Sequence, residues 1–163
     1  MTLHPTIVFI FGGSGDLTNR KLIPALYNLY LDRFLPEKYT VVGIGRTPIS
    51  DEDYRNNLLT GVRDFSRRKD QLDVKWTEFA QNVHYQSRDL KDDNSYRGIF
   101  EWIEQKGAEW GVVPNVIFYL SVAPQLAPGI ATKLHQHKIC EDRSAQGSFL
   151  KNLSDTICKA HAS

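Results

Sequence analysis

A cluster of glycines follows the first apolar run of the chain, in the sequence Gly12-Gly-Ser-Gly15. Glycine turns the chain sharply and has no side chain to obstruct a ligand, so backbone N–H groups can approach a pyrophosphate at the positive end of a helix. Ser14 and Thr18 add hydroxyl donors beside this loop. The spacing is shorter than the G-x-G-x-x-G pattern, and glycine-rich turns also join strands to helices for structural reasons alone. The loop therefore predicts either a dinucleotide-binding turn or a plain connection.

A cation follows the second apolar run. That run, Tyr39–Gly45, leads into Arg46 with no Asp or Glu beside it. NAD-binding units usually place a carboxylate here for the ribose 2′-OH, whereas NADP-binding units accommodate an arginine for the 2′-phosphate. Taken alone, Arg46 is equally typical of a solvated loop cation. Together with the glycine loop, it favours NADP over NAD.

Alternating strands and helices must position these residues. Apolar strand-like runs cover residues 6–11, 39–45, 83–86 and 115–121. Runs without polar alternation indicate strands buried on both faces. Helical spacing covers about residues 19–33 and 50–79, then a segment around Tyr96 that we expect Gly107 to terminate, and a helix beginning near Pro124 or Pro128. This order predicts an α/β protein with a Rossmann-type, doubly wound parallel sheet.

Length and composition set the outer limits. The 163 residues allow one domain; 41% are hydrophobic, 24% are charged, and the net charge is +1. We expect no attraction to nucleic acid or anionic membranes, and no apolar run approaches the roughly 20 residues of a membrane span. The N-terminus lacks the basic start of a signal peptide. Cys140 and Cys158 are expected to be free thiols, so we expect a cytoplasmic protein.

One long motif is specific enough to indicate a family. The segment Gly12-Gly-Ser-Gly-Asp-Leu-Thr-Asn-Arg-Lys-Leu-Ile-Pro-Ala-Leu26 resembles the opening motif of the glucose-6-phosphate dehydrogenases. The segments Val42–Arg46, Asn115–Pro124 and Cys140–Arg143 follow in that family's order. The similarity runs from about residue 6 to residue 143.

The resemblance implies a cofactor, a site and a reaction. It implies NADP contacts from Gly12, Gly13, Ser14, Gly15, Asp16 and Leu17, with Arg46 on the 2′-phosphate. Further positions at or beside the cofactor are Lys21, Asp89, Leu90, Tyr119 and Pro124. Other interpretations stay open: Lys21 as an exposed helix cation, and Asp89 and Leu90 as a capping Asp and a core Leu. The implied reaction is hydride transfer from C1 of glucose 6-phosphate to NADP, the first step of the pentose phosphate pathway, in a full-length family that forms homo-oligomers.

Other segments of the family do not occur here. These are the substrate-lysine strand of the type Arg-Ile-Val-x-Glu-Lys-Pro-Phe-Gly and the later histidines that bind phosphate and act as the general base. The five histidines present match no catalytic motif: His4, His84, His135, His137 and His161. We therefore expect a partial Rossmann domain over residues 1–143, without strands five and six and without sugar oxidation of its own.

Residues 144–163 depart abruptly from the family. One permitted reverse translation, read in another frame, encodes Arg-Ile-Val-Leu-Glu-Lys-Pro-Phe-Gly, which we interpret as a shift of the coding frame after Arg143. The alternative is a divergent tail with a short amphipathic helix formed by Phe149, Leu150, Leu153, Ile157 and Cys158. Without a fifth strand, the run 115–121 would be an unpaired edge, and we expect a chain that is poorly soluble, molten or dependent on association for order.

Two rival functions follow from the same residues. A stand-alone NADP-binding or sensing module would need the glycine loop and Arg46 but no catalytic segment. A short-chain sugar reductase would need a Tyr-x-x-x-Lys pair. The sequence has none: Leu31 stands four residues after Tyr27, and Leu58 four after Tyr54.

Overall fold

A mixed five-stranded sheet forms the centre of the molecule. The computed structural model describes residues 3–65, 72–137, 139 and 155–159, the last segment as backbone. The strand order is β3-β2-β1-β4-β5. The first four strands are parallel to one another, and β5 is antiparallel to β4. The strands are β1 (Thr6–Phe11), β2 (Tyr39–Gly45), β3 (Val83–Ser87), β4 (Asn115–Leu120) and β5 (Asp155–Lys159). The predicted α/β class and the four parallel strands are confirmed.

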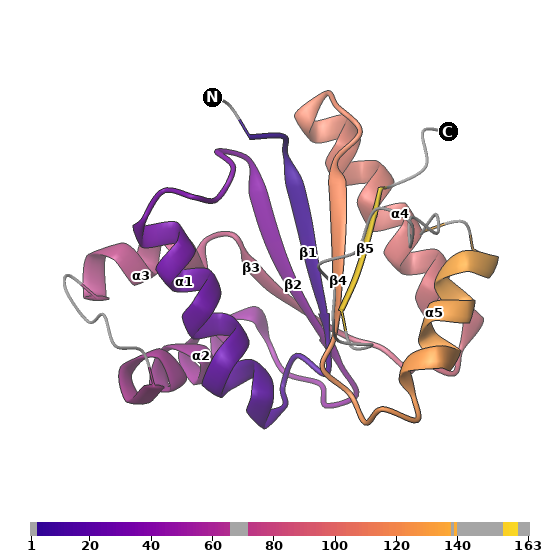
Figure 1. Cartoon of the computed structure of the whole chain (residues 1–163), viewed down its shortest axis with the longest axis horizontal. Coiled ribbons are helices and arrows are strands. Elements are labelled where there is room, and N and C mark those ends of the chain that lie inside the picture. The colour runs from indigo at the N-terminus through magenta and orange to yellow at the C-terminus, as the bar shows by residue number, and fades with distance from the viewer. Residues whose placement is uncertain (1–2, 66–71, 138, 140–154, 160–163) are drawn as a thin grey trace.

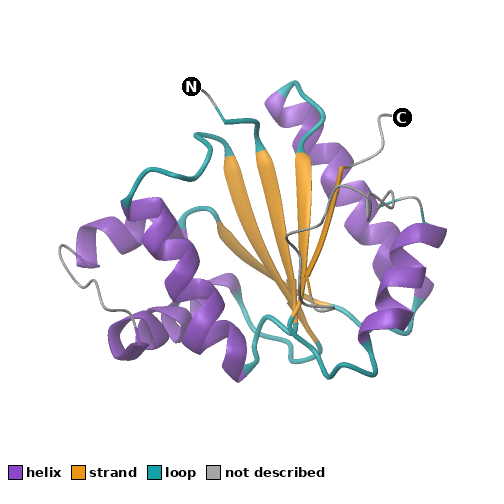
Figure 2. Ribbon diagram, viewed as in Figure 1, coloured by secondary structure: helices purple, strands orange, loops and turns teal. Residues whose placement is uncertain are grey.

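Helices cover both faces of this sheet, as Figures 1 and 2 show. On one face lie α1 (Ile23–Leu31), α2 (Asp51–Phe65) and α3 (Leu72–Ala80); on the other lie α4 (Asp93–Trp110) and α5 (Ala127–Gln136). In β1, Val8 and Ile10 pack under the first group, whereas Phe9 and Phe11 pack under the second. The continuous apolar run of β1 is the direct consequence of this double cover.

The first helical segment is not a single α-helix. Thr18–Leu22 forms a π-helical turn, in which the N–H of Ile23 bonds to the carbonyl of Thr18, and α1 follows from Ile23. Pro24 lies in the first turn of α1, directly after the π-helical turn, and has no N–H to donate to that turn. The periodic region 50–79 likewise contains two helices, α2 and α3.

Gly107 does not end the fourth predicted helix, so that prediction was wrong. Helix α4 continues to Trp110 and ends at Gly111, which has the left-handed φ of 69°. Gly107 serves a different purpose, because a Cβ there would lie 3.0 Å from the carbonyl oxygen of Val112 and 3.3 Å from the ring of Pro114. It makes room for the chain as it turns back towards β4.

The edge beside β4 also differs from expectation. β5 pairs with β4 in an antiparallel register that places Ile117 opposite Ile157, so β4 is not the unpaired edge that we predicted. The amphipathic helix is wrong for Ile157 and Cys158, which lie in this strand. In the part of the chain that the structure describes, the antiparallel β5 lies beside β4, where the family's parallel strand five would lie. The frame shift and the state of both cysteine side chains concern residues outside that description.

Among the helices of the described residues, none combines the length and apolar character required to cross a bilayer.

Candidate cofactor site

The carboxyl ends of the four parallel strands meet at one edge of the sheet. The chain runs from β1 outward to β2 and β3, and then returns to β4 on the opposite side of β1. The point of reversal, where open α/β sheets bind ligands, therefore lies between the ends of β1 and β4. The glycine loop follows β1, and the N–H of Ser121, after β4, donates to the carbonyl of Phe11 at 2.8 Å. The loop thus lies at this switch point.

Gly12 is required by geometry. Its φ is 81°, and a Cβ would lie 2.0 Å from the carbonyl oxygen of Ser121. At Gly13, a Cβ would lie 2.7 Å from the Cα of Gly43. The N–H groups of Gly12 and Gly13 both donate to the carbonyl of Ile44, at 2.9 and 3.0 Å. These two glycines therefore set the path of the loop, and their amides are not available to a phosphate.

The amides available to an anion belong to the next residues. The N–H of Gly15 donates to the carbonyl of Gly12 at 2.9 Å. Within the described part of the chain, the amides of Ser14, Asp16 and Leu17 have no backbone acceptor. Asp16 and Leu17 lie at the N-terminus of the helical segment that continues to Leu31. At this end of a helix, unpaired N–H groups and the helix dipole favour an anion.

Thr18 binds the glycine loop through its side chain. Its side chain is fully buried, and its hydroxyl donates to the carbonyl of Gly12 at 3.0 Å and lies 3.4 Å from the hydroxyl of Ser121. The expectation that this hydroxyl is available to a ligand is wrong. Ser14, in contrast, is exposed.

Two tyrosines donate hydrogen bonds to the glycine loop after β1 and to the loop after β2. Tyr54 donates to the carbonyl of Gly13 at 2.9 Å, and Tyr85 donates to the carbonyl of Thr47 at 2.7 Å. Their ring centroids are 4.8 Å apart. Burial raises the pKa of both phenols still further above neutral pH, so both hydroxyls are donors there.

The glycines of β2 make room for these hydroxyls. A Cβ on Gly43 would lie 2.2 Å from the Tyr54 hydroxyl, and one on Gly45 would lie 2.6 Å from the Tyr85 hydroxyl. Neither tyrosine was predicted as a site residue from the sequence. The available signal was the pair of glycines two residues apart in a buried strand, which leaves a bare strip on one face of the sheet.

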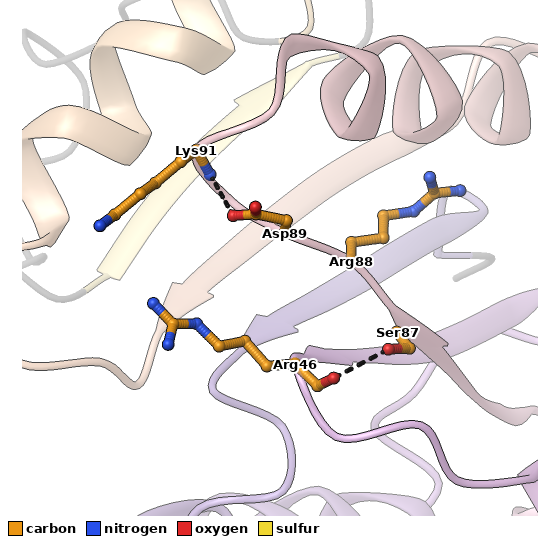
Figure 3. Close-up of a pocket in the computed structure, with 5 residues that line it drawn as sticks. All are labelled: Arg46, Ser87, Arg88, Asp89 and Lys91. Carbon is orange, nitrogen blue, oxygen red and sulfur yellow. Dashed lines mark hydrogen bonds between the residues drawn. The ribbon is translucent and has the colours of Figure 1, made fainter.

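A pocket of about 520 Å³ lies beyond the ends of β2 and β3. Figure 3 shows its five lining residues: Arg46, Ser87, Arg88, Asp89 and Lys91. Two bonds hold its two loops together: the Ser87 hydroxyl donates to the carbonyl of Arg46 at 3.0 Å, and the N–H of Arg88 donates to the carbonyl of Gly45 at 2.8 Å. Arg46 and Asp89, which the sequence placed after two separate strands, thus lie in one pocket.

The cations of this pocket differ in their freedom. Arg88 turns away from Arg46 and Lys91 (Figure 3) and donates to the side chain of Gln86 at 2.6 Å. A Cβ on Gly98 of α4 would lie 2.3 Å from the Arg88 guanidinium, so this group packs against the helix. Burial lowers the pKa of Arg88. Arg46 and Lys91 have no acidic partner among the described residues. Lys91 was not predicted from the sequence.

Several other predicted residues have contacts of their own. Asp89 accepts the N–H of Lys91 at 2.9 Å in the turn before α4, and the helix cap is Asp92, so the helix-capping interpretation of Asp89 is wrong. Leu90 packs beside the α4–α5 core, as the core interpretation expects. Asp16 pairs with Arg20 at 2.8 Å on the surface. Leu17, Lys21 and Pro124 are exposed. Tyr119 lies in β4 and packs beside the α1–α3 core. Among the described residues, no three His, Cys, Asp or Glu side chains gather as a metal site.

Comparison with known proteins agrees with this geometry. The chain is 35% identical over 148 residues to glucose-6-phosphate 1-dehydrogenase of Treponema pallidum, covering 91% of this chain and 28% of that protein. It is 32% identical to the enzyme of Leuconostoc mesenteroides, covering 84% of this chain and 27% of that protein. The chain thus spans about 28% of the length of the first of these relatives.

Solved structures show the same fold. A glucose-6-phosphate dehydrogenase in complex with its substrate glucose-6-phosphate superimposes with a TM-score of 0.75 at 31% identity, covering 84% of this chain and 29% of that chain. The family model described as "Glucose-6-phosphate dehydrogenase, NAD binding domain" matches residues 9–148. The chain therefore belongs to the glucose-6-phosphate dehydrogenase family and corresponds to its nucleotide-binding domain.

Proposed function

We propose that this chain binds NADP in preference to NAD and forms the cofactor-binding part of a glucose-6-phosphate 1-dehydrogenase. One observation carries the proposal: a loop with unpaired amides at the switch point lies on the same sheet edge as a pocket whose Arg46 has no acidic partner among the described residues. The bound cofactor would accept a hydride at its nicotinamide ring. The protein supplies binding and orientation.

The glycine loop and the pocket would bind different parts of the cofactor. The amides of Ser14, Asp16 and Leu17 would hold the pyrophosphate, which NAD and NADP share. Arg46 would pair with the 2′-phosphate, for which its planar guanidinium is well suited. The remaining predicted contacts, from Lys21, Asp89, Leu90, Tyr119 and Pro124, are proposals of the same kind.

The sugar chemistry belongs to the proposal as well. By likeness to its relatives, the substrate would be glucose 6-phosphate. Its oxidation needs a base to take the proton of the 1-OH. Three described histidines already have partners: His4 contacts the carbonyl of Val113, His84 contacts Asp51, and His137 contacts Asp93. These contacts support the proposal that the base lies elsewhere and that the 163-residue chain alone does not turn over. Homo-oligomeric assembly and a cytoplasmic location likewise stay proposals.

Calorimetric titration of the 163-residue chain with NADP and with NAD tests the cofactor assignment. A charge-assisted bond to the 2′-phosphate contributes about 1.5–3 kcal/mol, so NADP should bind about 10- to 150-fold more tightly. Equal affinity for the two cofactors would refute the assignment. NADPH formation from glucose 6-phosphate, measured on the same preparation, would separately show that the chain itself is catalytically competent.

A further inference from the structure

We infer that Lys91 is a second cation for the 2′-phosphate, so that this group is recognised jointly from the ends of β2 and β3. The inference rests on the proposed NADP-binding function and deepens it by adding a specificity-determining residue. Arg46 approaches from the loop after β2, and Lys91 from the loop after β3. Both line the same pocket, and in Figure 3 their side chains extend to the same side of it.

Hydrogen bonds hold the backbone at Lys91, and they fix the position of its Cα. Its N–H donates to a carboxylate oxygen of Asp89 at 2.9 Å, and the N–H of Asp92 donates to the carbonyl of Asp89 at 3.1 Å. This local turn is a common use of aspartate after a strand. Asp89 is therefore a positioning residue for Lys91.

The loop that carries Lys91 is also joined to the loop that carries Arg46. The Ser87 hydroxyl bonds to the carbonyl of Arg46, and the N–H of Arg88 bonds to the carbonyl of Gly45. These two bonds fix the spacing between the two backbone segments. An anion held by both side chains would therefore meet a pocket that is already formed, which reduces the ordering cost of binding.

The charges of the pocket favour a dianion. Three cations and one carboxylate line it. Arg88 is committed to Gln86 and to the surface of α4, whereas Arg46 and Lys91 have no acidic partner among the described residues. The lone carboxylate, Asp89, accepts a hydrogen bond from the backbone of Lys91. Two free cations suit a phosphate monoester, which carries a charge of about −1.5 to −2 at neutral pH.

The test is calorimetric binding of three adenosine nucleotides to the 163-residue chain: the 2′,5′-bisphosphate, the 3′,5′-bisphosphate and the 5′-monophosphate. Lys91→Met removes the charge and keeps the length of the side chain. It should weaken the 2′,5′-bisphosphate about 5- to 10-fold, as expected for one exposed charged contact, and leave the other two unchanged. Lys91→Arg should retain most of the wild-type affinity.

Lys38→Met is the matched control. Lys38 is exposed and precedes β2, so the same charge is removed at the amino ends of the strands, far from the pocket. Its nucleotide affinities should equal those of the wild type. Thermal unfolding of every variant checks that each one is folded.

The outcomes separate this inference from the proposed function. If Arg46→Ala loses the 2′,5′-bisphosphate and Lys91→Met does not, the role of Lys91 is refuted and the cofactor assignment stands. Equal weakening of all three nucleotides by Lys91→Met would also refute it, because the effect would be general attraction of anions. If the wild type does not prefer the 2′,5′-bisphosphate to the 5′-monophosphate, the proposed function fails, and this inference fails with it.

Discussion

In the proposed function, the glycine loop after β1 and the pocket after β2 and β3 would recognise phosphate by different means. In the loop, backbone atoms occupy the space beside each critical glycine, and a Cβ on Gly12 would overlap the carbonyl of Ser121. In the pocket, the proposed groups are the long side chains of Arg46 and Lys91, both of which are exposed. The loop therefore cannot change without disturbing the sheet, whereas the pocket can. The proposal therefore assigns the pyrophosphate, which both cofactors share, to the glycine loop, and the 2′-phosphate, which only NADP carries, to the pocket.

Gly12→Ala should have the largest effect. The substitution places a Cβ 2.0 Å from the carbonyl oxygen of Ser121 at a backbone φ of 81°. We expect a loss of stability of at least about 2 kcal/mol and loss of binding for both cofactors. Thermal unfolding and titration with NADP and NAD measure these effects. Gly129→Ala is the control, because nothing lies within 4 Å of that Cβ and alanine favours the helix. Unchanged binding in Gly12→Ala would contradict the rigid-loop account.

Arg46→Ala should have the next largest effect, and only on one cofactor. NADP should bind about 10- to 150-fold more weakly, because a charge-assisted pair of about 1.5–3 kcal/mol is lost, while NAD and the melting temperature stay unchanged. Arg97→Ala, at an exposed position of α4, is the matched control. Equal losses for NADP and NAD would contradict the assignment of Arg46.

The two tyrosines offer a paired test of smaller size. Tyr54→Phe removes the bond to Gly13 in the loop, and Tyr85→Phe removes the bond to Thr47 beside Arg46. Each should cost about 1 kcal/mol of stability. Titration with both cofactors should show that Tyr54→Phe weakens NADP and NAD alike, whereas Tyr85→Phe weakens NADP more. The same pattern in both variants would mean that the two regions are not separately supported.

The smallest effect lies outside both regions, where Lys133 and His137 contact Asp93 at 2.5 and 3.2 Å. Their hydrogen bonds lower the pKa of the Asp93 carboxyl below its ordinary value of 3.8. The stabilisation is therefore present above that ordinary value and is lost as the pH falls through the lowered pKa. Urea unfolding of the wild type and Asp93→Asn from pH 7 to acid should give a difference that shrinks towards acid, with unchanged cofactor binding. A difference that grows towards acid would contradict this assignment.

Much of the fold was predictable because burial leaves a direct trace in the sequence. A strand covered on both faces, such as β1, must be apolar throughout, and the position of Arg46 at the end of β2 follows from that strand's length. The end of α4 was not predictable in the same way. Gly107 and Gly111 are alike in sequence, and only the returning chain at Val112 and Pro114 distinguishes their roles.

The parts of the site that were missed depend on contacts between distant residues. Arg88 and Lys91 are both cations after β3, and the sequence does not show which one is free. Gly98 of α4 decides it, because its missing side chain accommodates the Arg88 guanidinium. Likewise, the antiparallel pairing of β5 with β4 brings together segments with a long stretch of chain between them, and no local pattern indicates it.

Backbone amide NMR spectra recorded during titration with NADP and with NAD test the division between the two regions most directly. The account predicts that the amide signals of Ser14, Asp16 and Leu17 shift with both cofactors, because the pyrophosphate is common to them. Signals of Arg46 and Lys91 should shift substantially with NADP only. Equal shifts of the pocket signals with both cofactors, or loop signals that move with neither, would contradict the account.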